Sequence, residues 1–284
     1  MSTAAISIKG LKKVYKDKVA VDGIDLEVKQ GEIFAILGPN GAGKTTTVEI
    51  LEGYRDRDGG TVCVLGEDPG NLGDKKYTWR ERIGIVLQST SDAGDLTVAE
   101  TIHHFSRYYS RSKDPESVIN LTGLREKAGA KIDTLSGGQR RRLDVALGII
   151  GNPELIFLDE PTTGFDPKAR RAFWDLILTL RNEGATILLT THYLDEAEAL
   201  ADRVAVIADG RILEISTPEN LGGRQSAQAR IMWLENGTTQ TRLSNHPTHD
   251  IAEIAQRFEG EIPELQVIRP SLEDIYLTMI GENL

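Results

Sequence analysis

Short, nearly continuous runs of apolar residues recur along much of the chain. Runs of this length without polar alternation are typical of strands that are covered on both faces, as in a parallel sheet. Several of the segments between them have the apolar spacing of helices. The pattern therefore predicts an α/β fold with a parallel sheet, whose strands are expected at 33–37, 83–87, 155–158, 186–190 and 204–208.

The N-terminal stretch has a different pattern, in which apolar and polar residues alternate. The apolar positions are separated by Gly and Asp, and they are Ile6, Ile8, Val19, Val21, Ile24, Leu26 and Val28. Alternation of this kind indicates strands with one buried face. We therefore expect short antiparallel strands before the parallel sheet begins.

A mostly helical stretch, at 98–110 and 115–124, lies between the second apolar run and Ser136. Ser136 itself is suited to cap the start of a further helix. The buried stripe expected on that helix, at the i, i+3, i+4, i+7 spacing, is Leu143, Ala146, Leu147 and Ile150. Arg140, Arg141 and Asp144 fall largely off this stripe.

The pattern changes again after about Pro218, where a small α+β region is expected. Its predicted strands are 230–234, 240–243 and 265–268, and its predicted helices are 250–258 and 272–280. We therefore divide the chain into a main domain, 1–217, with an inserted helical subdomain at about 89–150, and a C-terminal appendage, 218–284. A chain of 284 residues is long enough for one large domain and a smaller one.

The composition is that of an ordinary folded protein with an acidic balance. Hydrophobic residues make up 39% and charged residues 27%, and the formal net charge is −10. Binding to nucleic acid depends on clustered Lys and Arg, so no nucleic-acid partner is expected. The basic clusters around Lys9 to Lys18 and at 140–142 are interpreted first as solvated faces. The single cysteine, Cys63, is expected to be a small buried residue in a strand at 61–65.

No apolar run approaches the length of a membrane-spanning helix. Crossing a bilayer takes about 18 or more consecutive apolar residues, and the runs here are far shorter. The N-terminus lacks the charged segment, apolar segment and small-residue cleavage site of a secretory signal. These observations predict a cytoplasmic protein without a membrane segment of its own.

The strand expected at 33–37 leads directly into a glycine-rich loop. The loop reads Gly38, Pro39, Asn40, Gly41, Ala42, Gly43, Lys44, Thr45 and Thr46, and a helical pattern follows it. Glycines let backbone N–H groups curve around phosphates, the helix N-terminus adds a positive dipole, Lys44 reaches the β- and γ-phosphates, and Thr45 can hold Mg²⁺. The plainer alternative is a glycine-rich turn that only opens a helix. If the loop binds a nucleotide, it does not by itself distinguish between a kinase, a GTPase, a helicase and a transport ATPase.

Two carboxylates stand at the end of another predicted strand. The run 155–158 delivers Asp159 and Glu160 to its carboxyl end, where open α/β sheets bind ligands. An isolated Asp at this place would more simply cap the next turn. Together with the glycine-rich loop, however, Asp159 is expected to hold Mg²⁺, and Glu160 to orient or deprotonate an attacking water.

A further segment narrows the class of nucleotide-binding protein. It reads Leu135, Ser136, Gly137, Gly138 and Gln139. By itself this segment could be interpreted as the capped start of a helix with two flexible glycines. In this order, between a phosphate-binding loop and an Asp–Glu strand end, it resembles the signature motif of ABC transporter ATPases. The resemblance covers roughly residues 6–217 and implies a P-loop NTPase core with an antiparallel β subdomain and an inserted helical subdomain.

The resemblance also implies roles for further residues. Tyr15 stands where the family places an aromatic ring against adenine, Gln88 matches the glutamine that links Mg²⁺ and water to the helical subdomain, and His192 matches the switch histidine at the γ-phosphate. The segment 161–166 resembles the D-loop, with Phe165 where leucine is commoner. Standing alone, Tyr15 and His192 would more often be structural residues, but their order within the set favours the functional interpretation.

Cofactors and partners follow from the same resemblance. It implies ATP and Mg²⁺, with the metal at Thr45, Gln88 and, through water, Asp159. It implies a head-to-tail dimer with a second copy, in which Ser136, Gly137, Gly138, Gln139 and Asp166 act on the other subunit's nucleotide. The remaining partner is an integral membrane permease in a separate chain, which would place the protein on the inner face of the plasma membrane.

The C-terminal residues indicate which kind of molecule is transported. Residues 270–276 resemble the C-terminal sequence of the drug and antibiotic exporter branch, which implies export of drug-like or antibiotic-like molecules. The alternative is an ABC ATPase that acts on nucleic acid or ribosomes without transport. Such chains carry two ATPase halves or long coiled-coil insertions, whereas this sequence has one glycine-rich loop, one signature motif and no sustained heptads.

Overall fold

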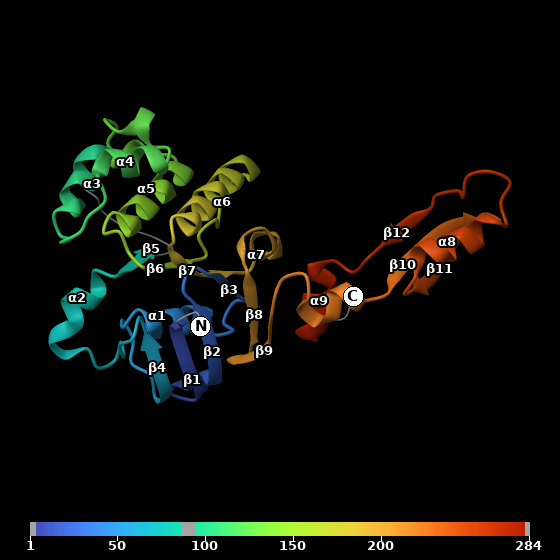
Figure 1. Ribbon diagram of the computed structural model, residues 1–284, viewed down its shortest axis with the longest axis horizontal. Coiled ribbons are helices and arrows are strands. Elements are labelled where there is room, and N and C mark those ends of the chain that lie inside the picture. The colour runs from blue at the N-terminus through green and yellow to red at the C-terminus, as the bar shows by residue number, and fades with distance from the viewer. Residues whose placement is uncertain (1–3, 87–94, 282–284) are drawn as a thin grey trace. The chain divides into compact units, whose positions relative to one another are not determined.

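The structure is a computed structural model that describes residues 4–86 and 95–281 (Figure 1). The chain divides into two compact units, Met1–Ile215 and Ser216–Leu284. In the residues that the structure describes, no helix is long and apolar enough to cross a membrane.

A six-stranded sheet forms the centre of the first unit, in the order β5-β6-β7-β3-β8-β9. Its strands are β3 (Ile33–Leu37), β5 (Ile83–Val86), β6 (Leu155–Asp159), β7 (Thr186–Thr191), β8 (Arg203–Ala208) and β9 (Arg211–Ser216). The pairs from β5 to β8 are parallel. This confirms the parallel sheet predicted from the apolar runs, and β3 and β7 are buried along their whole length, as strands covered on both faces must be.

A three-stranded antiparallel sheet, in the order β2-β1-β4, packs against this core. It consists of β1 (Ala4–Tyr15), β2 (Lys18–Lys29) and β4 (Gly59–Val64). The antiparallel pairing was predicted, but the expectation of short strands is wrong, because β1 and β2 are each 12 residues long. Register shifts between them, in the manner of β-bulges, let the long hairpin bend while its pairing continues.

Cys63 is exposed, so the prediction of a buried cysteine is wrong. Side chains alternate along β4, and Val62 and Val64 occupy the inward positions. Cys63 therefore faces outward.

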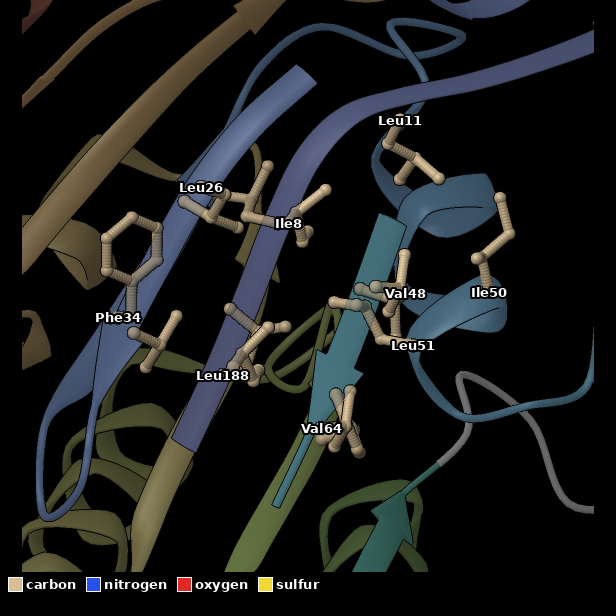
Figure 2. Packing of buried hydrophobic residues seen from close by; sticks show 14 of the residues in the cluster. Ile8, Leu11, Leu26, Phe34, Val48, Ile50, Leu51, Val64 and Leu188 are labelled. Carbon is tan, nitrogen blue, oxygen red and sulfur yellow. The ribbon is translucent and has the colours of Figure 1, made fainter. Parts of the chain in front are cut away.

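One hydrophobic cluster joins the two sheets and the helix α1 (Lys44–Leu51). Figure 2 shows Ile8 of β1 and Leu51 of α1 around the same interior as Phe34 and Leu188 of the parallel sheet. Burial of each such side chain contributes about 1.5–3 kcal/mol to folding. The cluster therefore fixes β3 and α1 relative to each other, and with them the glycine-rich loop that connects the two.

Three helices of the first unit gather on the side of the parallel sheet away from the antiparallel sheet (Figure 1). They are α3 (Val98–Ser106), α4 (Pro115–Leu121) and α5 (Gly137–Ile149). The first two end three or four residues before the ends predicted for them. Helix α4 stops where Gly123 takes a φ of 66°, the left-handed geometry that commonly closes a helix.

The first unit contains further helices besides these and α1. They are α2 (Lys76–Arg80), α6 (Pro167–Asn182), α7 (Leu194–Leu200) and the 3₁₀ helices η1 (Gly73–Lys75), η2 (Arg125–Lys127) and η3 (Ile132–Thr134).

Helix α5 begins as predicted but buries a different face. Ser136 caps it, and its side chain and that of Gln139 satisfy each other's backbone N–H groups. Arg141, expected on a solvated face, and Asp144, expected off the buried stripe, are only 6% and 7% exposed, whereas Leu147 of the predicted stripe is half-buried. The prediction fails because the Arg141 guanidinium group is drawn inward by backbone carbonyl groups of another segment.

The second unit is a small α+β fold, as predicted. Its sheet has the order β11-β10-β12, formed by β10 (Ala229–Glu235), β11 (Thr238–Ser244) and β12 (Gln266–Ile268). Helix α8 (Pro247–Ala255) places Ile254 against Ile231 and Trp233 of β10, which gives the unit its own core. The other helices are η4 (Leu221–Ser226) and α9 (Leu272–Met279), and Ser271 caps the latter.

Candidate active site

The loop between β3 and α1 approaches neighbouring backbone too closely for any residue but glycine. A Cβ atom on Gly38 would lie 2.3 Å from the carbonyl oxygen of Ile207, and one on Gly43 would lie 2.3 Å from that of Ala20. Gly43 also has a φ of 104°. These two positions hold the loop down against the strands, so that α1 starts at Lys44 with its N-terminal N–H groups at the loop. This arrangement is suited to bind an anion.

Lys44 is buried at this loop and surrounded by oxygen atoms. Its side chain is 4% exposed, and Nζ donates to the carbonyl oxygens of Gly38 at 2.8 Å and Pro39 at 3.2 Å. Nζ also lies 3.4 Å from Oε1 of Glu160, at the end of β6. The ammonium group is thus held between the glycine-rich loop and the carboxylate predicted to act on water.

Asp159 accepts hydrogen bonds from two hydroxyl groups on different elements. Thr45 Oγ1, in the first turn of α1, donates to Oδ2 at 3.2 Å, and Thr190 Oγ1 of β7 donates to Oδ1 in a short hydrogen bond. The carboxylate is therefore fixed from both sides. A hydroxyl group and a carboxylate in contact are hard oxygen donors of the kind that hold Mg²⁺ beside nucleotide phosphates.

Glu160 sits at a sharp turn directly after β6, with a φ of 43°. Its backbone N–H group lies 3.1 Å from both the carbonyl oxygen and the hydroxyl oxygen of Thr190, which holds this unusual geometry in place. Its side chain extends toward the next strand end, where Oε2 is 3.3 Å from Nδ1 of His192. One carboxylate thus meets Lys44 through one oxygen and His192 through the other.

Arg141 supports the end of β6 from α5. Its guanidinium group donates from Nε to the carbonyl oxygen of Pro161 and from a terminal nitrogen to that of Asp159, each at 3.0 Å. Burial lowers the pKa of Arg141, while Asp144, Asp159 and Glu196 oppose that shift. The signature helix therefore contacts the backbone on both sides of Glu160.

Glu52 is a second buried acid near this site, at the C-terminal end of α1. It is 6% exposed, and burial raises its pKa to about 8, with smaller contributions from the negative charges of Asp159 and Glu49. The protonated form is therefore favoured in the folded chain at neutral pH.

Tyr15 lies at the end of β1 with two cations beside its ring. Lys13 Nζ is 5.5 Å and the Arg55 guanidinium carbon 5.2 Å from the ring centroid. The ring is half-buried, as an aromatic that packs on a nucleobase would be. Gln88 lies outside the described residues.

The two segments predicted to act on a partner's nucleotide lie next to each other. A Cβ atom on Gly138 would be 3.7 Å from the side chain of Ala169, in the first turn of α6. Asp166 caps α6 by accepting from the N–H groups of Lys168 and Ala169. Phe165 packs its ring on Phe173 at 5.7 Å between centroids, so phenylalanine has a packing role at this position.

Sequence reasoning missed two residues that shape this site, Thr190 and Arg141. The signal for Thr190 was the hydroxyl pair Thr190–Thr191 at the end of a buried strand, just before His192. β7 runs parallel to β6 beside it, so a hydroxyl group at the carboxyl end of β7 lies within reach of Asp159. Arg141 had no such signal, because its acceptors are backbone carbonyl groups.

Comparison with known proteins identifies the family. A model described as ABC transporter matches residues 21–163. The chain is 41% identical to Nod factor export ATP-binding protein I of Burkholderia orbicola, over 100% of this chain and 99% of the relative. The chain belongs to the ABC transporter family. It is also 43% identical to the daunorubicin/doxorubicin resistance ATP-binding protein DrrA of Streptomyces peucetius, over 98% of this chain and 93% of that one.

Solved structures of ABC cassettes share the fold of the first unit. The dimeric cassette MJ0796, bound to ADP and Pi in a post-hydrolysis state, matches with a TM-score of 0.67 and 26% identity over 75% of this chain and 98% of that chain. CbiO1 of Clostridium perfringens matches with a TM-score of 0.68 and 28% identity over 76% and 90%. As a member of this family, the chain is an ATP-binding subunit of the exporter type and an ATPase. Such subunits work with membrane permeases and form dimeric cassettes.

Proposed function

We propose that the chain hydrolyses ATP to drive a separate membrane permease that exports drug-like or antibiotic-like molecules. One observation carries this proposal. The Glu160 carboxylate, just after β6, contacts both Lys44 at the start of α1 and His192 just after β7. The cargo class rests on the relatives, which are named for Nod factor export and for daunorubicin and doxorubicin resistance. The protein would work on the inner face of the plasma membrane.

The glycine-rich loop and Lys44 bind the phosphates in this account. The segment from Gly38 to Thr46, which includes Asn40, Gly41 and Ala42, presents backbone N–H groups, and the ammonium group of Lys44 exchanges its carbonyl partners for β- and γ-phosphate oxygens. Tyr15 stacks on the adenine ring.

Glu160 acts on the attacking water. Its carboxylate is fixed by Lys44 on one side and His192 on the other, so an oxygen is positioned to accept a proton or to orient the water for in-line attack. His192 contacts the γ-phosphate and reports its presence to Glu160. These groups act by position and charge and form no covalent intermediate.

Mg²⁺ fits the donor set at Thr45 and Asp159. The described residues contain no cluster of three or more His, Cys, Asp or Glu side chains, so a protein-only cage for a metal is not formed there. Mg²⁺ needs no such cage, since it commonly binds one or two protein oxygens, phosphate oxygens and waters. Thr45 would ligate directly and Asp159 through water, with Gln88 as a further ligand. The metal would neutralise charge that develops on the phosphates.

A second copy of the chain completes the site in a head-to-tail dimer. Ser136 and the glycines behind it open α5, whose N-terminal N–H groups and dipole are suited to face an anion. We assign that anion to the γ-phosphate on the partner's Lys44. Asp166 lies beside this helix start and would meet the same partner site.

We assign a different role to each part of the chain. In our assignment residues 1–217 form the ATPase domain, its helical subdomain at about 89–150 receives the permease, and 218–284 form an appendage. The helical subdomain carries an exposed aromatic cluster, His104, Phe105 and Tyr108, with ring centroids 5.2 to 6.1 Å apart. Tyr108 is 65% and Phe105 37% exposed. Aromatic side chains are enriched at protein interfaces, and we assign the cluster to a cytoplasmic segment of the permease.

The test is the ATPase activity of Glu160→Gln. The variant should bind ATP with near-parental affinity and lose turnover by at least about 100-fold, because the amide keeps the shape of the side chain but cannot accept the proton. It should also accumulate as an ATP-filled dimer in size-exclusion chromatography. Parental turnover in this variant would remove Glu160 from the mechanism, and absence of ATP hydrolysis by the unmodified chain with its permease would overturn the proposal.

A further inference from the structure

Arg141 of α5 holds the polypeptide backbone on both sides of Glu160. Its guanidinium group donates to the carbonyl oxygen of Asp159, in the peptide group that precedes Glu160, and to that of Pro161, which follows it. Both hydrogen bonds are 3.0 Å long, and Arg141 is only 6% exposed. A planar guanidinium group presents its donors in a fixed fork, so the two carbonyl oxygens are held at a fixed spacing.

The peptide group between Asp159 and Glu160 is held at both of its polar atoms. Arg141 bonds the carbonyl oxygen, and the N–H group of the same peptide lies 3.1 Å from two oxygen atoms of Thr190 on β7. Glu160 has a φ of 43°, a left-handed geometry that is unfavourable for a residue with a side chain. Such a geometry persists only where neighbouring groups hold it, and Arg141 and Thr190 supply such groups here.

The backbone geometry of Glu160 decides where its carboxylate lies. Oε1 is 3.4 Å from Nζ of Lys44, and Oε2 is 3.3 Å from Nδ1 of His192. A change of φ at Glu160 would swing the whole side chain about the backbone. A turn that relaxed toward ordinary geometry would therefore move the carboxylate away from these two partners.

Helix α5 connects Arg141 rigidly to Ser136, which caps the start of the helix. Near its other end α5 lies tightly on β5, because a Cβ atom on Gly84 would be 2.2 Å from the carbonyl oxygen of Gly148. Arg141 is five residues after Ser136, which corresponds to about 7.5 Å along a helix axis. A shift of the helix start would therefore carry the guanidinium group with it, and its two carbonyl partners would have to follow or lose their hydrogen bonds.

We infer that Arg141 is a positioning residue, which fixes the orientation of the Glu160 carboxylate in its own chain according to where the start of α5 lies. The inference deepens the proposed function and rests on it for its catalytic consequence. Loss of the guanidinium group should leave nucleotide binding at Lys44 intact and slow the hydrolytic step. In the proposed dimer Ser136 faces the partner's nucleotide, so α5 meets one site of the dimer while its Arg141 acts on the other.

The first experiment compares kcat with the Kd for ATP. Arg141→Met removes every donor at similar side-chain length, and we expect kcat to fall by about tenfold, as for a misplaced catalytic group, with the Kd within about twofold of the parent. Arg141→Lys keeps the charge but loses the fork, so about a third of parental kcat should remain. Arg111→Ala, at an exposed arginine of the helical subdomain, should behave as the parent. Parental kcat in the Arg141 variants that show a cooperative thermal transition, or a loss confined to the Kd, would overturn the inference.

A second experiment distinguishes an effect on the Glu160 of the same chain from a defect at the start of α5. Two verified mixed dimers carry the same two substitutions, Arg141→Met and Glu160→Gln, and the reference is a mixed dimer of the parent with Glu160→Gln. With the substitutions on different chains, the remaining Glu160 belongs to the chain that lacks the arginine, and hydrolysis should be about tenfold slower than in the reference. With both on one chain, the intact chain keeps both residues, and hydrolysis should match the reference within about twofold.

Equal slowing in the two arrangements would overturn the inference, because the effect would then lie at the partner's nucleotide. The reference dimer tests the proposed function separately. Parental hydrolysis in that dimer would count against the role of Glu160 itself, so the two failures are distinguishable.

Discussion

Lys44 Nζ and Glu160 Oε1 lie 3.4 Å apart, although the two residues are 116 positions apart in sequence and belong to different elements. The lysine is buried and also bonded to two loop carbonyl groups. A cation held in this way is positioned to bind phosphate oxygens without a large rearrangement.

Replacement of Lys44 should therefore affect binding, in contrast to replacement of Glu160. Lys44→Ala removes the charged donor to the phosphates, and a charged hydrogen bond is worth about 1.5–3 kcal/mol, so the Kd for ATP should rise by about 10- to 100-fold. Isothermal titration calorimetry measures this directly. Lys9→Ala, an exposed lysine on β1, makes the same change in net charge and should leave the Kd unaltered. Equal Kd values for the parent and Lys44→Ala would contradict the assignment.

Thr190 should matter for catalysis through Asp159. Thr190→Val removes the hydroxyl group that donates to Asp159 and receives the N–H group of Glu160, so both acids lose an anchor. We expect kcat to fall by about tenfold, and the Mg²⁺ concentration for half-maximal activity to rise by about tenfold, within the range seen for outer-shell partners of metal ligands. Activity measured across a magnesium titration tests this. Thr190→Ser should behave as the parent, and a valine variant with parental magnesium dependence would exclude the role.

The aromatic cluster at the C-terminal end of α3 should be required for transport alone. Phe105→Ala combined with Tyr108→Ala removes its exposed rings, which are far along the chain from Lys44 and Glu160. Basal ATPase activity of the isolated chain should be unchanged, while drug export by cells that carry the permease should fall by at least about tenfold, as for loss of interface anchors. Tyr77→Ala, at an 80% exposed aromatic on α2, is the matched control. Normal export by the double variant would move the permease contact elsewhere.

Glu52 should make the folded chain less stable as the pH rises. Its pKa is about 8 in the folded state against 4.5 for an ordinary glutamate, so between these values the unfolded chain ionises while the native residue keeps its proton. Each pKa unit is worth 1.36 kcal/mol, so the contribution of Glu52 to the free energy of unfolding should fall by about 5 kcal/mol from pH 4.5 to pH 8. Above pH 8 it should change no further.

Urea unfolding of Glu52→Gln at a series of pH values isolates this effect. The glutamine variant cannot ionise, so its advantage over the parent should grow from near zero at about pH 4.5 to its full value near pH 8. Glu219→Gln, at an exposed position, should show no such growing difference. A constant difference between Glu52→Gln and the parent at all pH values would mean that the carboxyl group titrates normally.

The sheet and the nucleotide loop could be predicted because their signals are local. Short runs of apolar residues with no polar interruption are typical of strands buried on both faces, and the spacing of Gly38, Gly43 and Lys44 indicates a strand, a tight loop and a helix start. Ser136 and Gln139 likewise carry their capping box within four residues. In each case the interacting groups are neighbours in the chain.

Arg141 and Glu196 could not be predicted in the same way. Arg141 is buried because it meets carbonyl groups of Asp159 and Pro161, and the backbone of another segment has no sequence pattern of its own. Glu196 is a charged residue in the first turn of a helix, where an exposed side chain would be expected, yet it is fully buried, and Trp174 of α6 donates a hydrogen bond to it. Cys63 is different, since alternation with Val62 and Val64 would have predicted its exposure.

The most direct test of the account asks whether two copies share one site, by mixing Lys44→Ala with Ser136→Arg. Neither variant alone should trap ATP, since each lacks half of every site. In a mixed head-to-tail dimer, one site inherits both lesions, while the other pairs an intact Lys44 loop with an intact Ser136 helix. The measurement is the ATP retained by verified mixed dimers after rapid gel filtration. A site shared between two copies should retain one occluded ATP per mixed dimer, and mixed dimers that retain none would contradict such a shared site.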